Sequence, residues 1–231
     1  NFSKEEVKHD EKMNHDKELL WSGADNDNVR KYYKDKFGCD TTEELLTQYK
    51  ESRLNHRGTI VEMAITSILY KFLHDKYIVM RSSTFDDYEN GVDNVIVHKE
   101  TGEVICAFDE VYDSHDHERV DAKDKKILNK AMKGGAKIKY GFSLEADGDV
   151  RKLVKQEIKN VPAFYLAMSD VQLDALLLNK DIDSLESISE EERIVFTKLL
   201  ASLESQVTML KSNDIPESIS SQLDKFLEAL R

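Results

Sequence analysis

Carboxylates stand at the ends of two predicted neighbouring strands. Residues 92–113 are rich in β-branched and aromatic residues and are interrupted at Gly102, which predicts two strands joined by a turn. Asp93 begins the first strand, and Asp109 and Glu110 lie near the end of the second. Because hairpin pairing brings these ends together, the carboxylates should repel one another unless a cation lies between them. The pattern indicates a functional site; the alternative is a set of acids that face water at the sheet margin.

Another acid, Glu62, lies on the clearest predicted helix. Apolar residues recur at helical spacing along residues 57–74, which indicates an amphipathic helix with one buried face. Glu62 falls in the first turns of this helix. A carboxylate near a helix N-terminus is favourable in itself, so this position is also explained without a function.

Lysines follow the acidic hairpin. Residues 118–133 predict a helix with one continuous basic face, made of Lys123, Lys126, Lys130 and Lys133. Residues 136–144 predict a strand, and its alternation places Lys137 and Lys139 on the same face. A lysine face is usually solvated, but beside an acidic hairpin it is also what a phosphate-binding site presents.

The net charge of −12 is unevenly distributed along the 231 residues. Residues 57–113 carry 5 basic and 11 acidic residues, a net charge of −6, whereas residues 114–160 carry 12 basic and 8 acidic residues, a net charge of +4. The basic segment fits contact with a phosphate backbone. The overall acidity argues against tight non-specific binding to nucleic acid.

Cysteine usage and hydropathy indicate the cellular compartment of the protein. Cys39 and Cys106 have neither metal-site nor redox-motif spacing, and so few cysteines favour a reducing compartment; we expect a cytoplasmic protein. No apolar run approaches the roughly 20 residues of a membrane span. The sequence starts at Asn1, so a preceding segment is expected. The His115-Asp116-His117 triplet lacks an apparent third metal ligand and is expected to be a solvated loop.

The element pattern predicts an α/β fold in three parts. Residues 1–56 are expected to form a helical N-terminal extension, in which residues 1–20 form either a helix or a partly disordered segment. Residues 57–169 are expected to form an α/β core, and residues 170–231 helices packed on that core. Within the core, residues 77–81 and 161–168 read as strands, 82–91 as a loop and 150–158 as a helix. In the last part, capping residues and apolar stripes predict three helices, over residues 170–178, 189–210 and 216–230.

From residue 57 the predicted order is helix, three strands, helix, strand, which resembles the αβββαβ core of the restriction-endonuclease-like, PD-(D/E)xK, nucleases. The resemblance covers roughly residues 57–144 and implies a mixed sheet. Glu62 matches the acid of the family's first helix. Asp93, in Gly91-Val92-Asp93, matches the acid that opens the second strand, with Val where the family often has Pro. Asp109 or Glu110 matches the acid of the third strand.

The chain departs from the family at the motif lysine. Two residues after the candidate acids stand Val111 and Tyr112, and neither is lysine. The family sometimes moves this lysine to a neighbouring element. The resemblance therefore implies that Lys137 or Lys139, or else Lys123, takes its place.

The resemblance implies a metal-dependent nuclease that hydrolyses phosphodiester bonds of DNA. Asp93, Asp109 and Glu110 would hold Mg²⁺ or Mn²⁺, and Glu62 would orient the metal or bind it through water. The alternative is a catalytically inactive module of the same fold that binds a protein or nucleic-acid partner, with the helical ends as the surfaces for such a partner or for a second copy. A third possibility is a structural protein whose acids are surface residues.

Overall fold

The computed structural model describes residues 2–113, 117–147, 150–178 and 187–229. The chain divides into two compact units, residues 1–60 and residues 61–231. Among the described residues, no helix combines the length and apolar character that crossing a membrane requires.

The first unit is helical. Its helices are α1 (Lys4–Ser22), α2 (Asp27–Phe37) and α3 (Thr42–Leu54). Capping boxes open α1 and α3, and the Lys50 ammonium of α3 lies 2.8 Å from the Glu18 carboxylate of α1. Of the two alternatives that the sequence leaves open for the first residues, the structure shows the helix, from Lys4 to Ser22.

The second unit is built on a mixed sheet of four strands in the order β1-β2-β3-β6. Its strands are β1 (Tyr77–Arg81), β2 (Asn94–His98), β3 (Val104–Asp113) and β6 (Ala163–Ser169). The first three strands pair antiparallel, and β6 pairs with β3 in parallel. A parallel pair needs a long crossover, which here contains helix α5 (His117–Met132).

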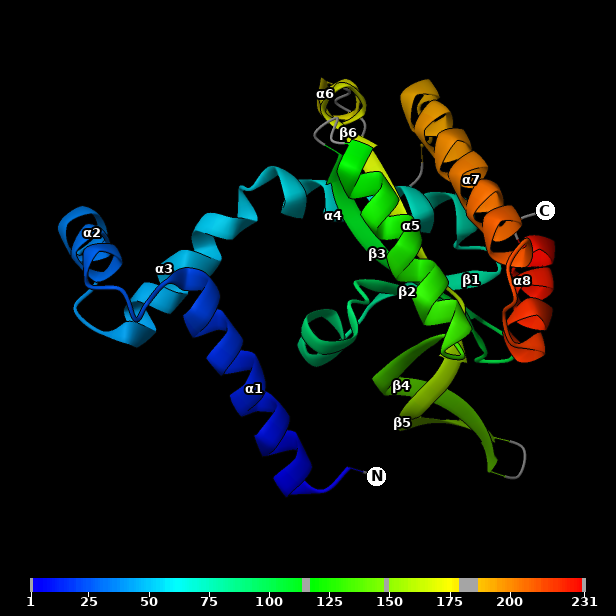
Figure 1. Cartoon of the computed structure of the whole chain (residues 1–231), viewed down its shortest axis with the longest axis horizontal. Helices are drawn as coiled ribbons and strands as arrows, with labels where there is room; N and C mark the ends of the chain where they lie inside the picture. The colour runs from blue at the N-terminus through cyan, green and yellow to red at the C-terminus, as the bar shows by residue number, and fades with distance from the viewer. Residues whose placement is uncertain (1, 114–116, 148–149, 179–186, 230–231) are drawn as a thin grey trace. The chain divides into compact units, whose positions relative to one another are not determined.

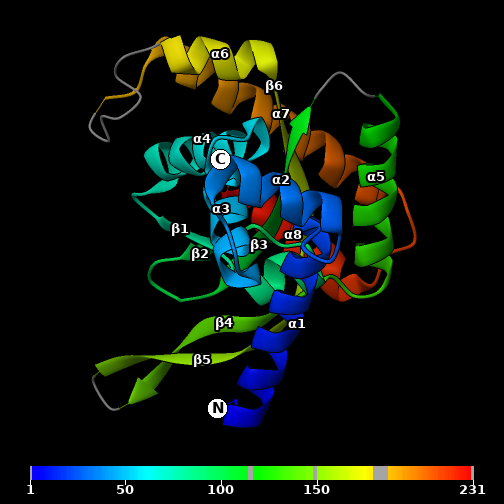
Figure 2. The same ribbon diagram turned by 90° about the vertical axis from the view of Figure 1, so that its left-hand side faces the viewer.

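Helices cover the two faces of this sheet (Figures 1 and 2). One face packs on α4 (Arg57–Leu73), α7 (Glu190–Lys211) and α8 (Glu217–Ala229), where Phe108 of β3 and Phe226 of α8 share an apolar layer with Leu69 of α4 and Leu203 of α7. Helix α5 lies on the other face. The remaining helices are α6 (Asp170–Leu178), as expected, and η1, a π-helical turn over Asp86–Asn90 where the sequence predicts a loop.

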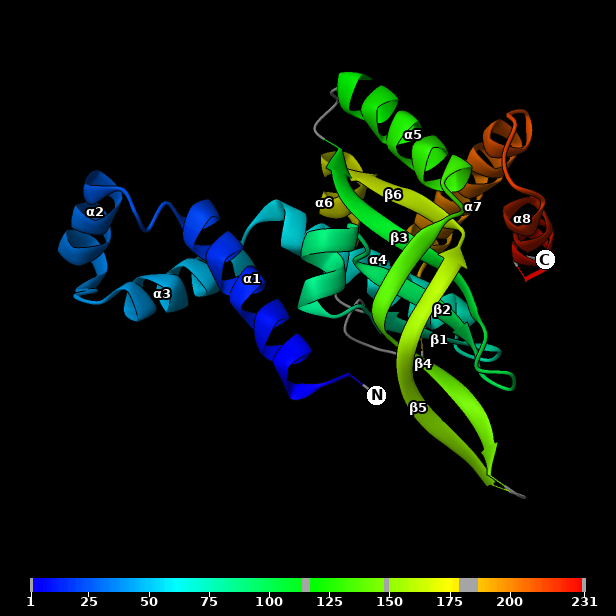
Figure 3. The same cartoon turned by 60° about the horizontal axis from the view of Figure 1, so that its bottom comes forward.

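A two-stranded ribbon, β4 (Ala136–Asp147) with β5 (Val150–Val161), forms a sheet of its own. Its base packs on β2 and β3, where Ile138 shares a core cluster with Val95 and Ala107, and its far end extends away from the main sheet (Figure 3). The prediction of a helix over residues 150–158 is therefore wrong. The apolar residues of this segment have helical spacing, but pairing decides: Leu153 lies opposite Leu144, and Ile158 lies opposite Ile138. Within the ribbon, Ile158 fills the space beside Gly141, where an added Cβ would lie 2.6 Å from its Cδ1 atom.

The ribbon also changes the order of the predicted core. The strand that starts at Ala136 was expected to be the last strand of the core, but it does not pair with the four-stranded sheet. The strand beside β3 is β6, the predicted buried strand near residues 161–168. Phe164 and Leu166 on one face of β6 and Tyr165 on the other are all buried, so the parallel pair is covered on both sides.

Candidate functional site

Asp93 lies immediately before β2, where three strands are tied together. Its backbone N–H donates to the carbonyl of Phe108 on β3 at 2.7 Å, and its carbonyl accepts from the N–H of Ser82, next to β1, at 2.8 Å. The Asp93 Oδ2 atom accepts a hydrogen bond from the backbone N–H of Glu110 at 2.5 Å. The structure thus places Asp93 beside the acids of β3, at the end where β2 begins.

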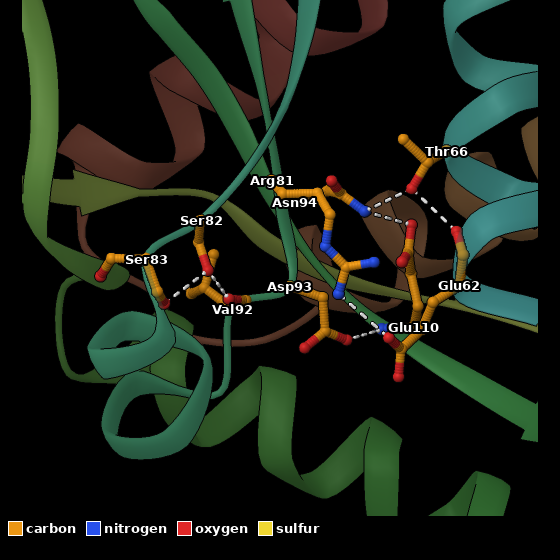
Figure 4. A network of polar contacts seen from close by, with 9 residues as sticks. All are labelled: Glu62, Thr66, Arg81, Ser82, Ser83, Val92, Asp93, Asn94 and Glu110. Carbon is orange, nitrogen blue, oxygen red and sulfur yellow. Dashed lines mark hydrogen bonds and ion pairs between the residues drawn. The ribbon is translucent and has the colours of Figure 1, made fainter. Parts of the chain in front are cut away.

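Glu110 is held on the α4 side of the sheet by an amide (Figure 4). The Asn94 Nδ2 atom donates to Glu110 Oε1 at 2.8 Å and to the hydroxyl of Thr66, on α4, at 2.9 Å. Glu110 is only 7% exposed, and its second oxygen, Oε2, has no hydrogen-bond partner among the described residues. A buried carboxylate oxygen without a donor is costly, so this position favours a proton or a cation.

Arg81 brings a positive charge to the same place. It ends β1 opposite Asn94, and its Nη2 atom donates to Glu62 Oε2 at 3.0 Å. Burial opposes the guanidinium charge, but Glu62, Glu110 and Asp93 outweigh it and raise the pKa of Arg81 above its usual range. One guanidinium therefore balances part of the charge of three carboxylates, Glu62, Asp93 and Glu110 (Figure 4).

The carboxyl groups of Asp93 and Glu110 are both strained as anions. Burial raises the pKa of Asp93 to about 7, against the opposing hydrogen bond from the Glu110 backbone and with further repulsion from Asp109, Asp87 and Glu62. Burial also raises the pKa of Glu110 well above its usual value, and repulsion from Asp93 adds to it. Shifts of this kind are concentrated at functional sites.

Asp109 occupies the other face of β3, because successive strand residues point to opposite sides. Its two oxygens contact α5: Lys123 Nζ lies 2.7 Å from Oδ1, and Lys126 Nζ lies 2.6 Å from Oδ2. Burial alone would raise the pKa of Asp109, but the two ammonium groups outweigh burial and hold it below its usual value. In contrast to Asp93, Asp109 is stable as an anion.

Lys130, a third lysine on the same face of α5, caps the C-terminal end of the π-helical turn η1. Its ammonium donates to the carbonyls of Asn90 at 2.7 Å and Gly91 at 2.9 Å. Burial and then repulsion from Lys126 lower the pKa of Lys130 to about 8. Of the four lysines on the predicted basic face, Lys123 and Lys126 thus contact Asp109 and Lys130 contacts the turn before β2, while Lys126 and Lys133 remain exposed to solvent.

The lysines of β4 are placed elsewhere. Lys137 is exposed, and the Lys139 ammonium lies 4.8 Å from the ring centre of Phe85. Of the three lysines that the resemblance offers as replacements, Lys123 is the one in contact with a candidate acid. The position of the motif lysine after Glu110 is taken by Tyr112, whose hydroxyl donates to Asp170 of α6.

Asp86 is a buried acid that plays a structural part. Its carboxylate accepts from the hydroxyl of Ser83 at 2.7 Å, from the amide of Asn90 at 2.7 Å, and from the backbone N–H groups of Lys139 and Tyr140 at 2.6 and 3.0 Å. With so many donors it fastens the π-helical turn to β4. His115 and Asp116 lie outside the described residues.

Sequence reasoning did not single out Arg81, Asn94 or Thr66. A signal existed for Asn94, since an amide at the start of an apolar strand needs a partner when it is buried. Arg81 carried no signal, because a charged residue at a strand end is ordinary.

The carboxylates supply only hard oxygen donors, the type that Mg²⁺ and Mn²⁺ prefer. Within residues 2–113, 117–147, 150–178 and 187–229, however, no three His, Cys, Asp or Glu side chains are positioned to hold one metal ion. The predicted ligands divide, since Asp109 engages α5 while Glu110 engages Asn94. The free Oε2 atom of Glu110 is the feature that fits a cation, with Asp93 and Glu62 as its neighbours.

No protein-family model matches the sequence, and no curated protein or solved structure matches the chain.

Proposed function

We propose that residues 61–231 form a divergent domain of the restriction-endonuclease-like type that hydrolyses phosphodiester bonds of DNA with the help of Mg²⁺ or Mn²⁺. The observation that carries the proposal is the Glu110 carboxylate, buried with an unpartnered oxygen beside Asp93. Burying two strained acids together costs stability without an evident structural return. A catalytic use of the acids would account for their burial side by side.

The order of elements supports this assignment. Helix α4, strands β1 to β3, helix α5 and strand β6 follow one another in the αβββαβ order, with the β4–β5 ribbon inserted before β6. Glu62 lies on the first helix, Asp93 at the start of the second strand and Glu110 on the third. These are the places where that family carries its acids.

The chain's own residues divide the work of such a site. Glu110 and Asp93 would hold the cation, with Glu62 beside them; the chemistry that the cation supplies is polarisation of the phosphate and a lower pKa for a bound water. Asn94 holds the Glu110 carboxylate in place through its bond to Oε1. Asn94 is itself fixed by Thr66, so the first helix and two strands set the orientation of one acid.

The α5 lysines would supply the positive charge that is missing on β3, where Tyr112 stands two residues after Glu110. Lys123 and Lys126 contact Asp109, one residue before Glu110. Asp109 lies on the face of β3 opposite Glu110, so an ammonium group would act here by turning from Asp109 toward the substrate, where it would stabilise the negative charge that builds on phosphate oxygens. In this proposal Lys123 or Lys126 fulfils the role of the motif lysine.

A second candidate function is a non-catalytic module that binds DNA or a protein. One observation favours it: cations of the chain already contact the acids, Arg81 at Glu62 and two lysines at Asp109. Glu62 and Asp109, which are paired in this way, need no metal to balance their charge. This module would bind without cleaving.

Cleavage of plasmid and single-stranded DNA with Mg²⁺ or Mn²⁺ tests the proposal. Wild type should cut, a chelator should stop cutting, and Asp93→Asn and Glu110→Gln should remove it. Glu103→Gln is the matched control, because this exposed acid lies at the opposite end of the same hairpin and forms an ion pair with surface Lys225. Undiminished cleavage by Glu110→Gln would contradict the proposal, and metal-independent DNA binding without cleavage would favour the second function.

A further inference from the structure

The Arg81 guanidinium is the cation placed among the carboxylates on the α4 side of the sheet. It donates to Glu62 Oε2 at 3.0 Å, and its charge also acts on Asp93 and Glu110 (Figure 4). A single positive charge faces three carboxyl groups. The local charge therefore remains negative whenever more than one of these groups is ionised.

The Glu110 carboxylate shows that Arg81 does not complete the site. Its Oε1 atom receives a hydrogen bond from Asn94, whereas the buried Oε2 atom receives none within the part of the chain that the structure describes. An oxygen with this degree of burial needs a donor or a cation. The Arg81 guanidinium donates its hydrogen bond to Glu62 instead.

Arg81 is able to leave this position at little cost. Its side chain is 47% exposed, and that of its partner Glu62 is 24% exposed. Ion pairs in contact with water contribute little net stability, because solvent screens them and ordering both side chains costs entropy. Rotation of the arginine into water would uncover Glu62 while Asn94 kept Glu110 in place.

We infer that Arg81 is a built-in competitor for a divalent cation at Glu62, Asp93 and Glu110. The guanidinium occupies the cation position in one state, and Mn²⁺ or Mg²⁺ occupies it in the other, with the arginine turned into solvent. This accounts for the lack of a preformed three-acid metal group in residues 2–113, 117–147, 150–178 and 187–229. The inference uses the same carboxylates as the proposed function but requires no cleavage of DNA.

Competition makes a quantitative prediction for metal binding. Only the fraction of molecules with Arg81 turned out can accept the cation, so the apparent affinity falls by that fraction. Removing the guanidinium should tighten binding of Mn²⁺ by about tenfold or more, the usual size of a coupling between two sites. Arg81→Met keeps the length of the side chain and removes its charge.

Isothermal titration with Mn²⁺ at low ionic strength, on the full chain, tests the inference. Arg81→Met should bind Mn²⁺ more tightly than wild type. Arg81→Lys retains the charge and should bind more weakly than Arg81→Met. The double variant Arg81→Met/Glu110→Gln should lose the gain. Equal dissociation constants for wild type and Arg81→Met, or a gain that persists in the double variant, would overturn the inference.

Two further measurements keep the outcome unambiguous. Circular dichroism establishes that each variant is folded, and Arg81→Gln, which can still donate to Glu62, replaces Arg81→Met if the latter does not fold. DNA cleavage is measured on the same samples. Tighter Mn²⁺ binding without cleavage by any variant supports the inference and removes the nuclease proposal. Cleavage by wild type together with equal Mn²⁺ affinities of wild type and Arg81→Met supports the nuclease proposal and overturns the inference.

Discussion

Replacing Asp93 by asparagine should stabilise the protein at alkaline pH and do so much less at acid pH. Asp93 is 9% exposed and its pKa is raised to about 7, chiefly by burial. An acid with a raised pKa in the folded state stabilises that state below its unfolded pKa, and this contribution is lost as pH rises through the folded pKa. Asparagine has no charge to bury, and its side-chain oxygen can still accept from the Glu110 N–H that Asp93 now engages.

The size of the effect follows from the two pKa values. A carboxyl with a pKa of about 7 when folded and about 3.9 when unfolded loses about 4 kcal/mol of stabilisation across its whole titration. About 3 kcal/mol of this falls between about pH 5 and about pH 8. For a chain of this size that corresponds to a difference of roughly 6–12 °C in Tm.

The assay is thermal and urea unfolding of wild type and Asp93→Asn at both pH values without divalent metal. The control is Asp109→Asn, because two lysines lower the pKa of Asp109 and its stabilisation disappears only in strong acid. Asp109→Asn should therefore destabilise equally at about pH 5 and about pH 8. If the difference between Asp93→Asn and wild type is the same at both values, the Asp93 charge is not buried as described, and the reasoning fails.

Three further predictions concern a buried ion pair, a glycine with positive φ and the response to Mn²⁺. Lys71 and Glu192 form a fully buried ion pair at 2.6 Å between α4 and α7, so Glu192→Gln should cost about 3–5 kcal/mol. Lys71→Met/Glu192→Gln should cost less, because it leaves no buried charge without a partner. Urea unfolding measures both losses, and equal free energies of unfolding for the single and the double variant would contradict this prediction. Gly135→Ala should destabilise the protein strongly, since φ is +92° and the added Cβ would lie 2.7 Å from the carbonyl oxygen of Val161. Gly58→Ala is the control, because no atom lies within 4 Å of the added Cβ there. Equal Tm values for the two variants would contradict this prediction. Mn²⁺ at 100 times its Kd should stabilise the wild type by about 2.7 kcal/mol and so raise its Tm. The Tm of Asp93→Asn should rise less, and an equal rise in both proteins would mean that Asp93 is not a ligand.

Local sequence was enough to predict the parts of the fold that have a strong period. The stripe of α4, the hairpin around Gly102 and the capping box before α7 each appear where the sequence predicts them. The proximity of Asp93 to Glu110 was predictable for the same reason, since a short turn fixes which strand ends meet.

Tertiary pairing decided what periodicity left open. The segment after Asp147 has helical spacing but becomes β5, because β4 offers it a partner. The strand beside β3 is β6 rather than β4, a choice between two apolar segments that local pattern does not distinguish. Both outcomes depend on contacts between residues that are distant in the chain.

The candidate site divides in the same way. The sequence by itself singled out Glu62 and Asp93 and left Asp109 and Glu110 as alternatives on the third strand; the structure separates these two, because Asp109 contacts α5 and Glu110 contacts Asn94. Only the tertiary structure decided its cations: α5 directs Lys123 at Asp109, and β1 directs Arg81 at Glu62. The physical reason is that a strand or helix period fixes which face a side chain takes, whereas the partner it meets depends on how separate elements pack.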